Sequence, residues 1–243
     1  MFMELEFVQM NNIYQYIILK KVKGDISFQS MENIVITRTA YRLTDKLHLE
    51  HPEAMKMLSK GHPYDMSTNI FERLPQIFYD EKPLDNYKYI RILGRENKHR
   101  VYKYIRKEYL NEPVNLYKYK ILLSKANGSG EFGETLSQPI IAEPNVGTTE
   151  TFLSIGIFNT IDEVNNCFKY IKTKFLRTML GVLKTTQDIT PDKWKYVPVQ
   201  DFSETSAIDW SKSIHEIDLQ LYHKYNLSKE EIDFIETNVK EMV

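Results

Sequence analysis

The sequence has a single cysteine, Cys167, and no apolar run that approaches the roughly 18–20 residues needed to span a bilayer. A lone cysteine excludes an internal disulfide and a cysteine-based zinc site, and it is typical of a reducing compartment. The first nine residues contain Glu4 and Glu6 but no basic residue, which is unlike a secretory or mitochondrial signal. We therefore expect a cytoplasmic protein with no membrane partner.

Internal repeats and low-complexity linkers are also absent, so neither a repeat array nor a flexible tether is indicated. The 243 residues are 42% hydrophobic and 12% aromatic, which is enough to bury a core. The charged fraction, 27%, is near the average for globular proteins and argues against a disordered chain. This composition fits one large domain, or one domain with a small appendage.

Charge is unevenly distributed along the chain, although the net charge is only −1. Residues 86–125 hold eleven Lys and Arg against three Glu, and residues 169–195 hold seven against two Asp. Residues 200–243 hold ten Asp and Glu against four Lys. The two basic segments suit a phosphate backbone, and the alternative is a solvated surface with scattered charge.

Alternating apolar and polar residues predict strands, and the clearest pair lies at 87–93 and 101–105. Gly94-Arg95-Glu96-Asn97 between them has the composition of a hairpin turn. Further strands are predicted within 28–43 and at 120–124, 139–142, 149–155 and 195–199.

The longest helical pattern is an amphipathic stripe over 161–183. Other helices are predicted at 4–21, around 53–58, at 211–225 and at 229–242, the last beginning with the capping box Ser228-Lys-Glu-Glu231. The mixed order of elements predicts an α+β fold, with one curved mixed β-sheet, a packing amphipathic helix and a helical C-terminal tail. We expect an N-terminal helix over 1–24, one domain over 25–205 and the tail over 206–243.

Three sequence patterns resemble catalytic motifs. Gly128-Ser-Gly130-Glu-Phe-Gly133 matches G-x-G-x-x-G, but a nucleotide site of that kind needs a helix to begin there, and a strand is expected instead. Asp85 with Glu96-Asn97-Lys98 has the spacing of a magnesium-dependent nuclease signature, although Glu96 is expected in a hairpin turn. His48 and His51 have no neighbouring cluster that would complete a metal site.

An adenine methyltransferase would need an Asn/Asp-Pro-Pro-aromatic loop to hold the flipped base, and the sequence has no Pro-Pro pair. Together with the three weak motifs, this absence favours a chain without its own catalytic centre. We therefore assign no catalytic residue, no metal ligand and no cofactor to this chain.

Several blocks between Tyr119 and Phe202 follow one another in a characteristic order. They are Lys120–Gly130, Pro139–Pro144, Thr148–Leu153, Tyr170–Phe175, Lys184–Asp188 and Tyr196–Phe202. This succession resembles the C-terminal target-recognition region of bifunctional, adenine-specific type II restriction–modification methyltransferases. Ile34–Leu43 and Lys224–Glu236 are similar to the beginning and the end of that region. Val197-Pro198-Val199 carries a more distant likeness to the recognition domains of type I specificity subunits.

The resemblance covers most of the chain and implies a bacterial domain that reads double-stranded DNA in the major groove while a partner flips out an adenine. The family's methyltransferase core, and any fused nuclease, lies upstream of the similar region and is not part of this sequence. The implied partners are double-stranded DNA and a methyltransferase domain or subunit, with or without a nuclease. S-adenosylmethionine and magnesium are expected on those partner domains.

Polar loops are the candidate DNA contacts, because basic side chains hold phosphates and amide or guanidinium groups read bases. The candidates are Arg38, Tyr41, Arg42, Lys125, Asn127, Gly128, Ser129, Gly130, Thr149, Lys184, Thr186, Gln187, Lys193 and Trp194. Each group has a structural alternative: a surface hairpin with a salt bridge, a mobile connection between strands, or a helix C-terminus that favours lysine. A further group, Tyr87, Tyr89, Tyr102 and Tyr104, is either a base-stacking platform or, as we favour, cross-strand packing.

Two other functions stay open. One is that of a small magnesium-dependent restriction endonuclease that uses Asp85, Glu96 and Lys98. The other is that of a protein-interaction module whose acidic helical tail docks on a basic partner.

Overall fold

The computed structural model describes residues 13–36, 41–58 and 60–242, and the chain divides into two compact units. Unit 1 comprises residues 1–35, 126–139 and 160–243, and unit 2 comprises residues 36–125 and 140–159. Both units are therefore assembled from separate stretches of sequence. The sequence analysis expected continuous domains, whereas the chain passes repeatedly between the two units.

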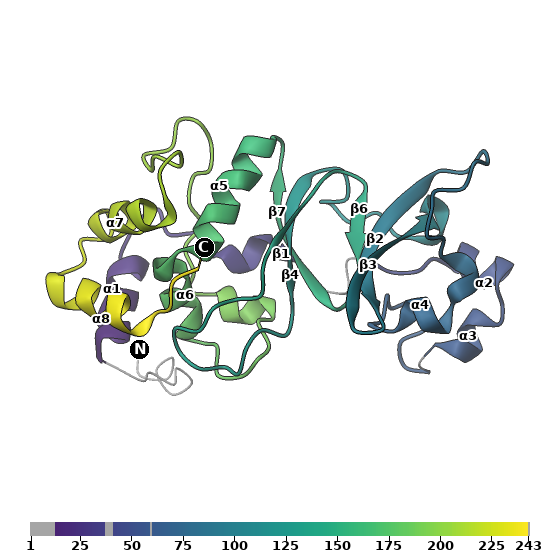
Figure 1. Ribbon diagram of the computed structural model, residues 1–243, viewed down its shortest axis with the longest axis horizontal. Coiled ribbons are helices and arrows are strands. Elements are labelled where there is room, and N and C mark those ends of the chain that lie inside the picture. Colours follow the sequence, from purple (N-terminus) through teal and green to yellow (C-terminus); the bar gives the residue numbers. More distant parts are fainter. Residues whose placement is uncertain (1–12, 37–40, 59, 243) are drawn as a thin grey trace. The chain divides into compact units, whose positions relative to one another are not determined.

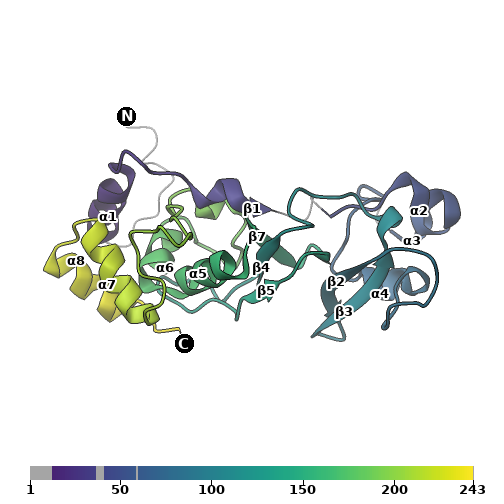
Figure 2. The ribbon, with the colours of Figure 1, turned by 90° about the horizontal axis from the view of Figure 1, so that it is seen from above.

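Unit 1 is helical (Figures 1 and 2). Its helices are α1 (Ile13–Lys23), α5 (Ile161–Lys172), α6 (Lys174–Gly181), α7 (Ile214–Lys224) and α8 (Lys229–Asn238), with 3-10 turns η1 (Met31–Ile34) and η4 (Pro191–Trp194). Helix α6 contacts α1, α5, α7 and α8. The rings of Phe175 and Tyr225 stack with their centroids 4.9 Å apart, so α6 supplies the centre of this core.

The amphipathic stripe predicted as one helix over 161–183 is two helices, because the chain turns at Thr173. This residue has extended backbone angles, and its side chain accepts a hydrogen bond from the amide of Leu176. Thr173 is therefore the N-cap of α6, a role that threonine fills better than a helix interior. The capping box predicted at Ser228 and Glu231 is confirmed at the start of α8.

Unit 2 holds most of the strands. They are β2 (Tyr89–Glu96), β3 (His99–Arg106), β4 (Tyr119–Ser124), β5 (Ile140–Ala142), β6 (Val146–Thr148) and β7 (Phe152–Phe158), with β1 (Val35–Ile36) where the chain enters the unit. One sheet has the order β1-β7-β4-β5 and the other β3-β2-β6. The α+β class is confirmed, but the strands of the described residues form two small sheets rather than one. The strand β6 follows β5 in the sequence, but it pairs in parallel with β2 and so belongs to the sheet of the β2–β3 hairpin.

Short helices cover one face of the β2–β3 hairpin (Figure 1). They are α2 (Asp45–Glu50), α3 (Ala54–Met57) and α4 (Ile70–Arg73), together with the 3-10 turns η2 (Pro75–Ile77) and η3 (Lys107–Tyr109). Ile90, Ile92 and Ile105 of the hairpin pack with Ile70 and Phe71 of α4 in a buried cluster. One face of the hairpin is thus committed to the core of unit 2.

Two further predictions have different outcomes. Residues 195–199 form no strand, and the contact that remains is an isolated bridge between Ser30 and Pro198, because proline cannot donate to a ladder. The predicted N-terminal helix is present as α1, and its earlier residues lie outside the described part of the chain.

Within the described ranges, no helix is both long enough and apolar enough to cross a membrane.

Candidate nucleic-acid interface

Two of the predicted DNA-contacting loops lie next to each other in unit 1. The backbone amide of Asn127 donates to the carbonyl of Gln187 at 2.7 Å. Gly130 faces Thr186 so closely that an added Cβ would lie 2.8 Å from its backbone, and Gly130 has a φ of +100°. The glycine is therefore required by packing within the unit. The fold brings together loops that are about sixty residues apart in sequence.

The donors of the glycine-rich loop are occupied by a carboxylate of the same chain. Glu134 accepts hydrogen bonds from the amides of Ser129 at 2.8 Å and Gly130 at 3.0 Å, and it forms an ion pair with Lys184. Burial raises the pKa of Glu134, but these hydrogen bonds and the lysine charge outweigh burial, and the pKa lies below its usual value. Glu134 is not among the residues selected from the sequence, although an acidic residue just after a glycine-rich loop competes for the loop's amides.

Several candidates are buried and make contacts inside their own unit. They are Tyr41, Asn127, Thr149, Lys184 and Trp194. The hydroxyl of Tyr41 donates to Asn115 Oδ1 at 3.0 Å, and Trp194 Nε1 donates to the carbonyl of Ile189 at 3.0 Å. In this conformation these side chains support the fold and do not reach the surface, so they are not part of an exposed interface.

Other candidates remain on the surface. Gly128, Ser129, Thr186 and Gln187 are exposed, and Gly130, Lys125 and Lys193 are half-buried. Lys193 pairs with Asp192 at 2.9 Å. Arg38 lies outside the described residues. These positions stay open as DNA contacts, but burial removes one amide, one lysine and one aromatic ring expected to accompany them, those of Asn127, Lys184 and Trp194.

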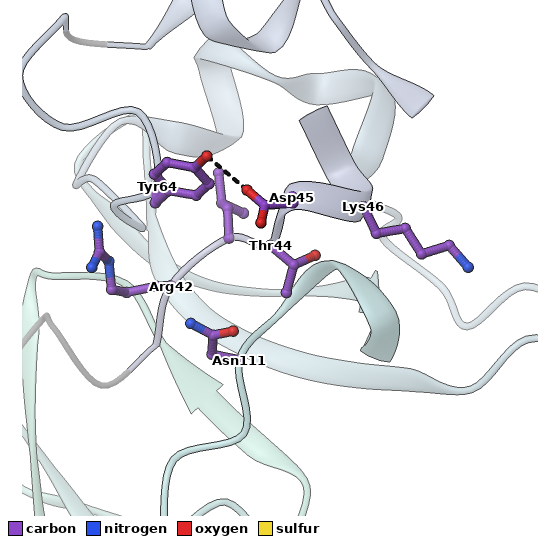
Figure 3. A pocket seen from close by; sticks show the side chains of 7 residues that line it. Arg42, Thr44, Asp45, Lys46, Tyr64 and Asn111 are labelled. Atoms are coloured by element: carbon purple, nitrogen blue, oxygen red, sulfur yellow. Dashed lines mark hydrogen bonds between the residues drawn. The ribbon is translucent and has the colours of Figure 1, made fainter. Parts of the chain in front are cut away.

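Arg42 borders an open hollow in unit 2 that contains both signs of charge (Figure 3). Its guanidinium lies 3.6 Å from the carboxylate of Asp65 and 5.7 Å from the ring of Tyr64. Asp45 also lines the hollow and accepts a hydrogen bond from the Tyr64 hydroxyl at 2.7 Å. Arg42 and Lys46 extend in opposite directions (Figure 3). The acidic neighbours make this hollow a weak site for phosphate.

The geometry separates the residues proposed for a nuclease. Asp85 accepts a hydrogen bond from the hydroxyl of Tyr89 at the start of β2, whereas Glu96 ends that strand. Tyr89 and Glu96 are seven positions apart in the strand, which corresponds to about 23 Å at roughly 3.3 Å per residue. Because Asp85 is held at the Tyr89 end, one magnesium ion cannot bind the carboxylates of both Asp85 and Glu96. Among the described residues, no three His, Cys, Asp or Glu side chains are grouped as a metal site.

The turn of the β2–β3 hairpin lies later than the sequence predicted. Gly94, Arg95 and Glu96 belong to β2, and Glu96 pairs with His99. The two turn residues are Asn97 and Lys98, with φ values of +50° and +68°, as in a type I′ turn. Strand position 94 accommodates only glycine, because a side chain there would collide with the ring of Phe71, 2.5 Å from the Cβ position.

This register places a group of basic side chains at the end of the hairpin, which we call the cationic tip. It consists of Arg95, Lys98, His99 and Arg100, all of which are exposed. Arg95 lies directly opposite Arg100, an arrangement that destabilises a strand pair. The only acidic residue in 95–100 is Glu96, which pairs with Lys103 at 3.0 Å on the other face of the hairpin. Residues 95–100 therefore carry three Lys and Arg side chains against one acidic side chain, which gives the tip a net positive charge.

The cationic tip continues along one side of the hairpin. Arg91 is exposed, and its guanidinium lies 4.0 Å above the ring of Tyr102. Tyr102 and the buried Leu93 pack on the neighbouring sheet. For Tyr102 this is a packing role, the alternative that we favoured over base stacking. Arg100 donates to the hydroxyl of Ser124 at 3.4 Å. The side of β2–β3 that carries residues 89, 91, 93, 95, 100, 102, 104 and 106 holds no acidic residue.

Comparison with models of known protein families and with curated proteins finds no match to this chain. The candidate interface is therefore assigned from its own geometry. The sequence shows the basic stretch 86–125, but no basic residue of the hairpin is among the predicted DNA contacts, because a turn shifted by two residues changes which side chains are at the end of the hairpin.

Proposed function

We propose that this chain binds double-stranded DNA through the β2–β3 hairpin. The observation that carries the proposal is the cationic tip, where the exposed Arg95 lies directly opposite the exposed Arg100. A two-stranded ribbon fits the major groove, and arginine forks contact both phosphates and guanine edges. Phosphate oxygens near the tip would convert an unfavourable pair of like charges into a favourable contact.

The division of charge between the units supports the same surface. Unit 2 holds 18 Lys and Arg against 13 Asp and Glu, a net charge of +5, and unit 1 holds 14 against 20, a net charge of −6. A polyanion is attracted by the local field rather than by the net charge of the whole chain. Unit 2 is thus the half of the chain that suits DNA.

We further propose that this binding sets the target sequence of an adenine-N6 methyltransferase in a bacterial restriction–modification system. The support for this step is the resemblance of the blocks between Tyr119 and Phe202 to the target-recognition region of such enzymes. In that role the chain contributes affinity and base readout, and the methyl transfer belongs to a partner domain or subunit.

The test is fluorescence anisotropy of the full chain with a mixed-sequence duplex over a range of salt concentrations. We expect the logarithm of the binding constant to fall linearly with the logarithm of salt concentration, and Arg95→Gln to reduce that slope by about one. Lys229→Gln is the matched control, because Lys229 is exposed and lies in unit 1. No duplex binding at low salt, or equal effects of the two variants, would overturn the proposal.

A further inference from the structure

Unit 2 has a second feature on the β2–β3 hairpin, at the end far from the cationic tip. It is an open hollow of about 520 Å³, which is within the size range of small-molecule sites. Its lining includes Lys82, Lys88, Arg91, Tyr104 and Asn145. Arg91 and Tyr104 are directly opposite each other in the ladder and lie on the side of the hairpin that holds no acidic residue. The hollow is thus built on the same strands as the tip.

The lining of this hollow is strongly basic. Lys82, Lys88, Arg91 and Lys107 line it against one acidic residue, Glu143. Within the described chain, no acidic side chain pairs with Lys82 or Lys88, whereas Lys107 pairs with Glu112 at 2.9 Å. The stacking of Arg91 on Tyr102 fixes its guanidinium without using its N–H donors. Two free lysines and a fixed arginine are groups that bind a phosphate.

The rest of the lining suits a flat aromatic ligand. Tyr87, Tyr89, Tyr104 and Tyr117 contribute rings, and Tyr87 and Tyr117 are 47% and 43% exposed. Asn145 is held at a φ of +65°, with its amide bonded to the carbonyl of Leu116 at 2.8 Å. The backbone of Asn145 is therefore fixed, and its side-chain amide is exposed and able both to donate and to accept hydrogen bonds.

We propose that this hollow binds a nucleotide, with the phosphate on Lys82 and Lys88 and the base against the tyrosine rings and the amide of Asn145. The proposal deepens the proposed function, on which it rests for the identification of nucleic acid as the ligand. Arg91 and Arg95 are about 13 Å apart along the strand at roughly 3.3 Å per residue, so one DNA molecule can reach both the hollow and the tip. An acidic peptide would use the lysines but gain nothing specific from the rings and the amide.

The nucleotide has two possible sources, a free molecule or an unpaired position in DNA, and two titrations of the full chain separate them. The first uses deoxynucleoside 5′-monophosphates and measures binding by calorimetry. The second compares a duplex that contains one bulged nucleotide with the same duplex fully paired. Lys88→Gln removes an exposed cation, and Lys229→Gln in unit 1 is its matched control. Tyr104→Leu removes a ring, and Tyr104→Phe retains it.

We expect binding in at least one titration, a rise of about tenfold in Kd with Lys88→Gln, equal to about 1.4 kcal/mol, and no change with Lys229→Gln. Tyr104→Leu is expected to weaken binding and Tyr104→Phe to preserve it. Binding of monophosphates identifies a free nucleotide, and a preference for the bulge that Lys88→Gln abolishes identifies an unpaired one.

The inference is overturned if the chain neither binds monophosphates nor prefers the bulged duplex. It is also overturned if poly-glutamate displaces the bound nucleotide and Tyr104→Leu has no effect on nucleotide binding. The two proposals fail separately. If Arg95→Gln weakens binding to the paired duplex but no nucleotide binds, the hollow is not a nucleotide site and the tip still binds DNA. If monophosphates bind but the paired duplex does not, the hollow stands and the proposed function fails.

Discussion

At the scale of single residues, Lys184 shows how a basic side chain that looks suited to DNA belongs to the interior. Its ammonium pairs with Glu134, and both side chains are largely buried. Loss of one partner from a buried pair leaves the other charge uncompensated, at a cost of about 3–5 kcal/mol. We expect Lys184→Met to lower the free energy of unfolding by this amount, measured by urea denaturation.

Lys193→Met is the control for this change, since Lys193 is half-buried and pairs with Asp192 near the surface. It is expected to change the free energy of unfolding by less than about 0.5 kcal/mol. A Lys184→Met protein of normal stability that loses affinity for DNA would show that the lysine contacts DNA, as the sequence suggested.

Asp218 provides a test by pH. Burial raises the pKa of this carboxyl to about 6, although the amides of Phe175 and Lys174 at the start of α6 donate hydrogen bonds to it. Because the folded pKa lies above the unfolded value near 4, the native state holds the proton more tightly, and its contribution to stability is lost as pH rises from about 4 to 6.

We expect the free energy of unfolding of the wild type, relative to Asp218→Asn, to fall by about 2–3 kcal/mol between pH 4 and pH 7. Urea denaturation of both proteins at several pH values measures this difference. Parallel pH profiles for the two proteins would show that Asp218 titrates normally. The sequence gives no sign of this carboxyl's role, since an acidic residue in an amphipathic helix is usually on the solvated face.

At the scale of elements, the sequence predicts which segments are helices and strands better than it predicts where they end. The β2–β3 hairpin and the capping box of α8 are found as expected. The break at Thr173 and the two-residue displacement of the hairpin turn are not. Tertiary contacts accompany both, since Asp218 of α7 accepts hydrogen bonds from the amides of Lys174 and Phe175, and Phe71 of α4 packs against Gly94. The position of that turn places the cationic tip at the end of the hairpin, so the tip could not be predicted before the strand register was known.

The turn itself gives a prediction with two opposite effects. Lys98 has a φ of +68°, which costs a non-glycine residue about 1–2 kcal/mol, and glycine is preferred at this position of a type I′ turn. Glycine is also more flexible in the unfolded chain, which offsets about 0.5–1 kcal/mol of that gain. We expect Lys98→Gly to raise the free energy of unfolding by about 0.5–1 kcal/mol and to reduce the salt slope of DNA binding.

Lys98→Ala separates these effects, because it removes the same charge but keeps a side chain at positive φ. Both variants should reduce the salt slope alike, and only the glycine variant should raise the midpoint of thermal unfolding. An unchanged salt slope in both variants would exclude Lys98 from the interface while leaving the conformational argument intact.

At the scale of the whole molecule, the two units carry different candidate contacts. Ser129, Thr186 and Gln187 are exposed in unit 1, whose net charge is −6, and the cationic tip is in unit 2, whose net charge is +5. Sequence blocks cannot reveal this division, because each unit is assembled from separate segments. Lys184 and Trp194 of unit 1 are buried, so they do not add a cation and an aromatic ring to its exposed polar loop.

Hydrogen exchange of the full chain, with and without a saturating duplex at low salt, distinguishes the two surfaces. Bound DNA shields and orders the segment that it contacts, and exchange of that segment slows. We expect slower exchange across 95–100 and little change at 126–130 and 184–188, because the acidic unit repels a polyanion. Protection confined to 126–130 and 184–188 would move the interface to the loops that the sequence resemblance selected. Protection of both surfaces would show that both units contact DNA.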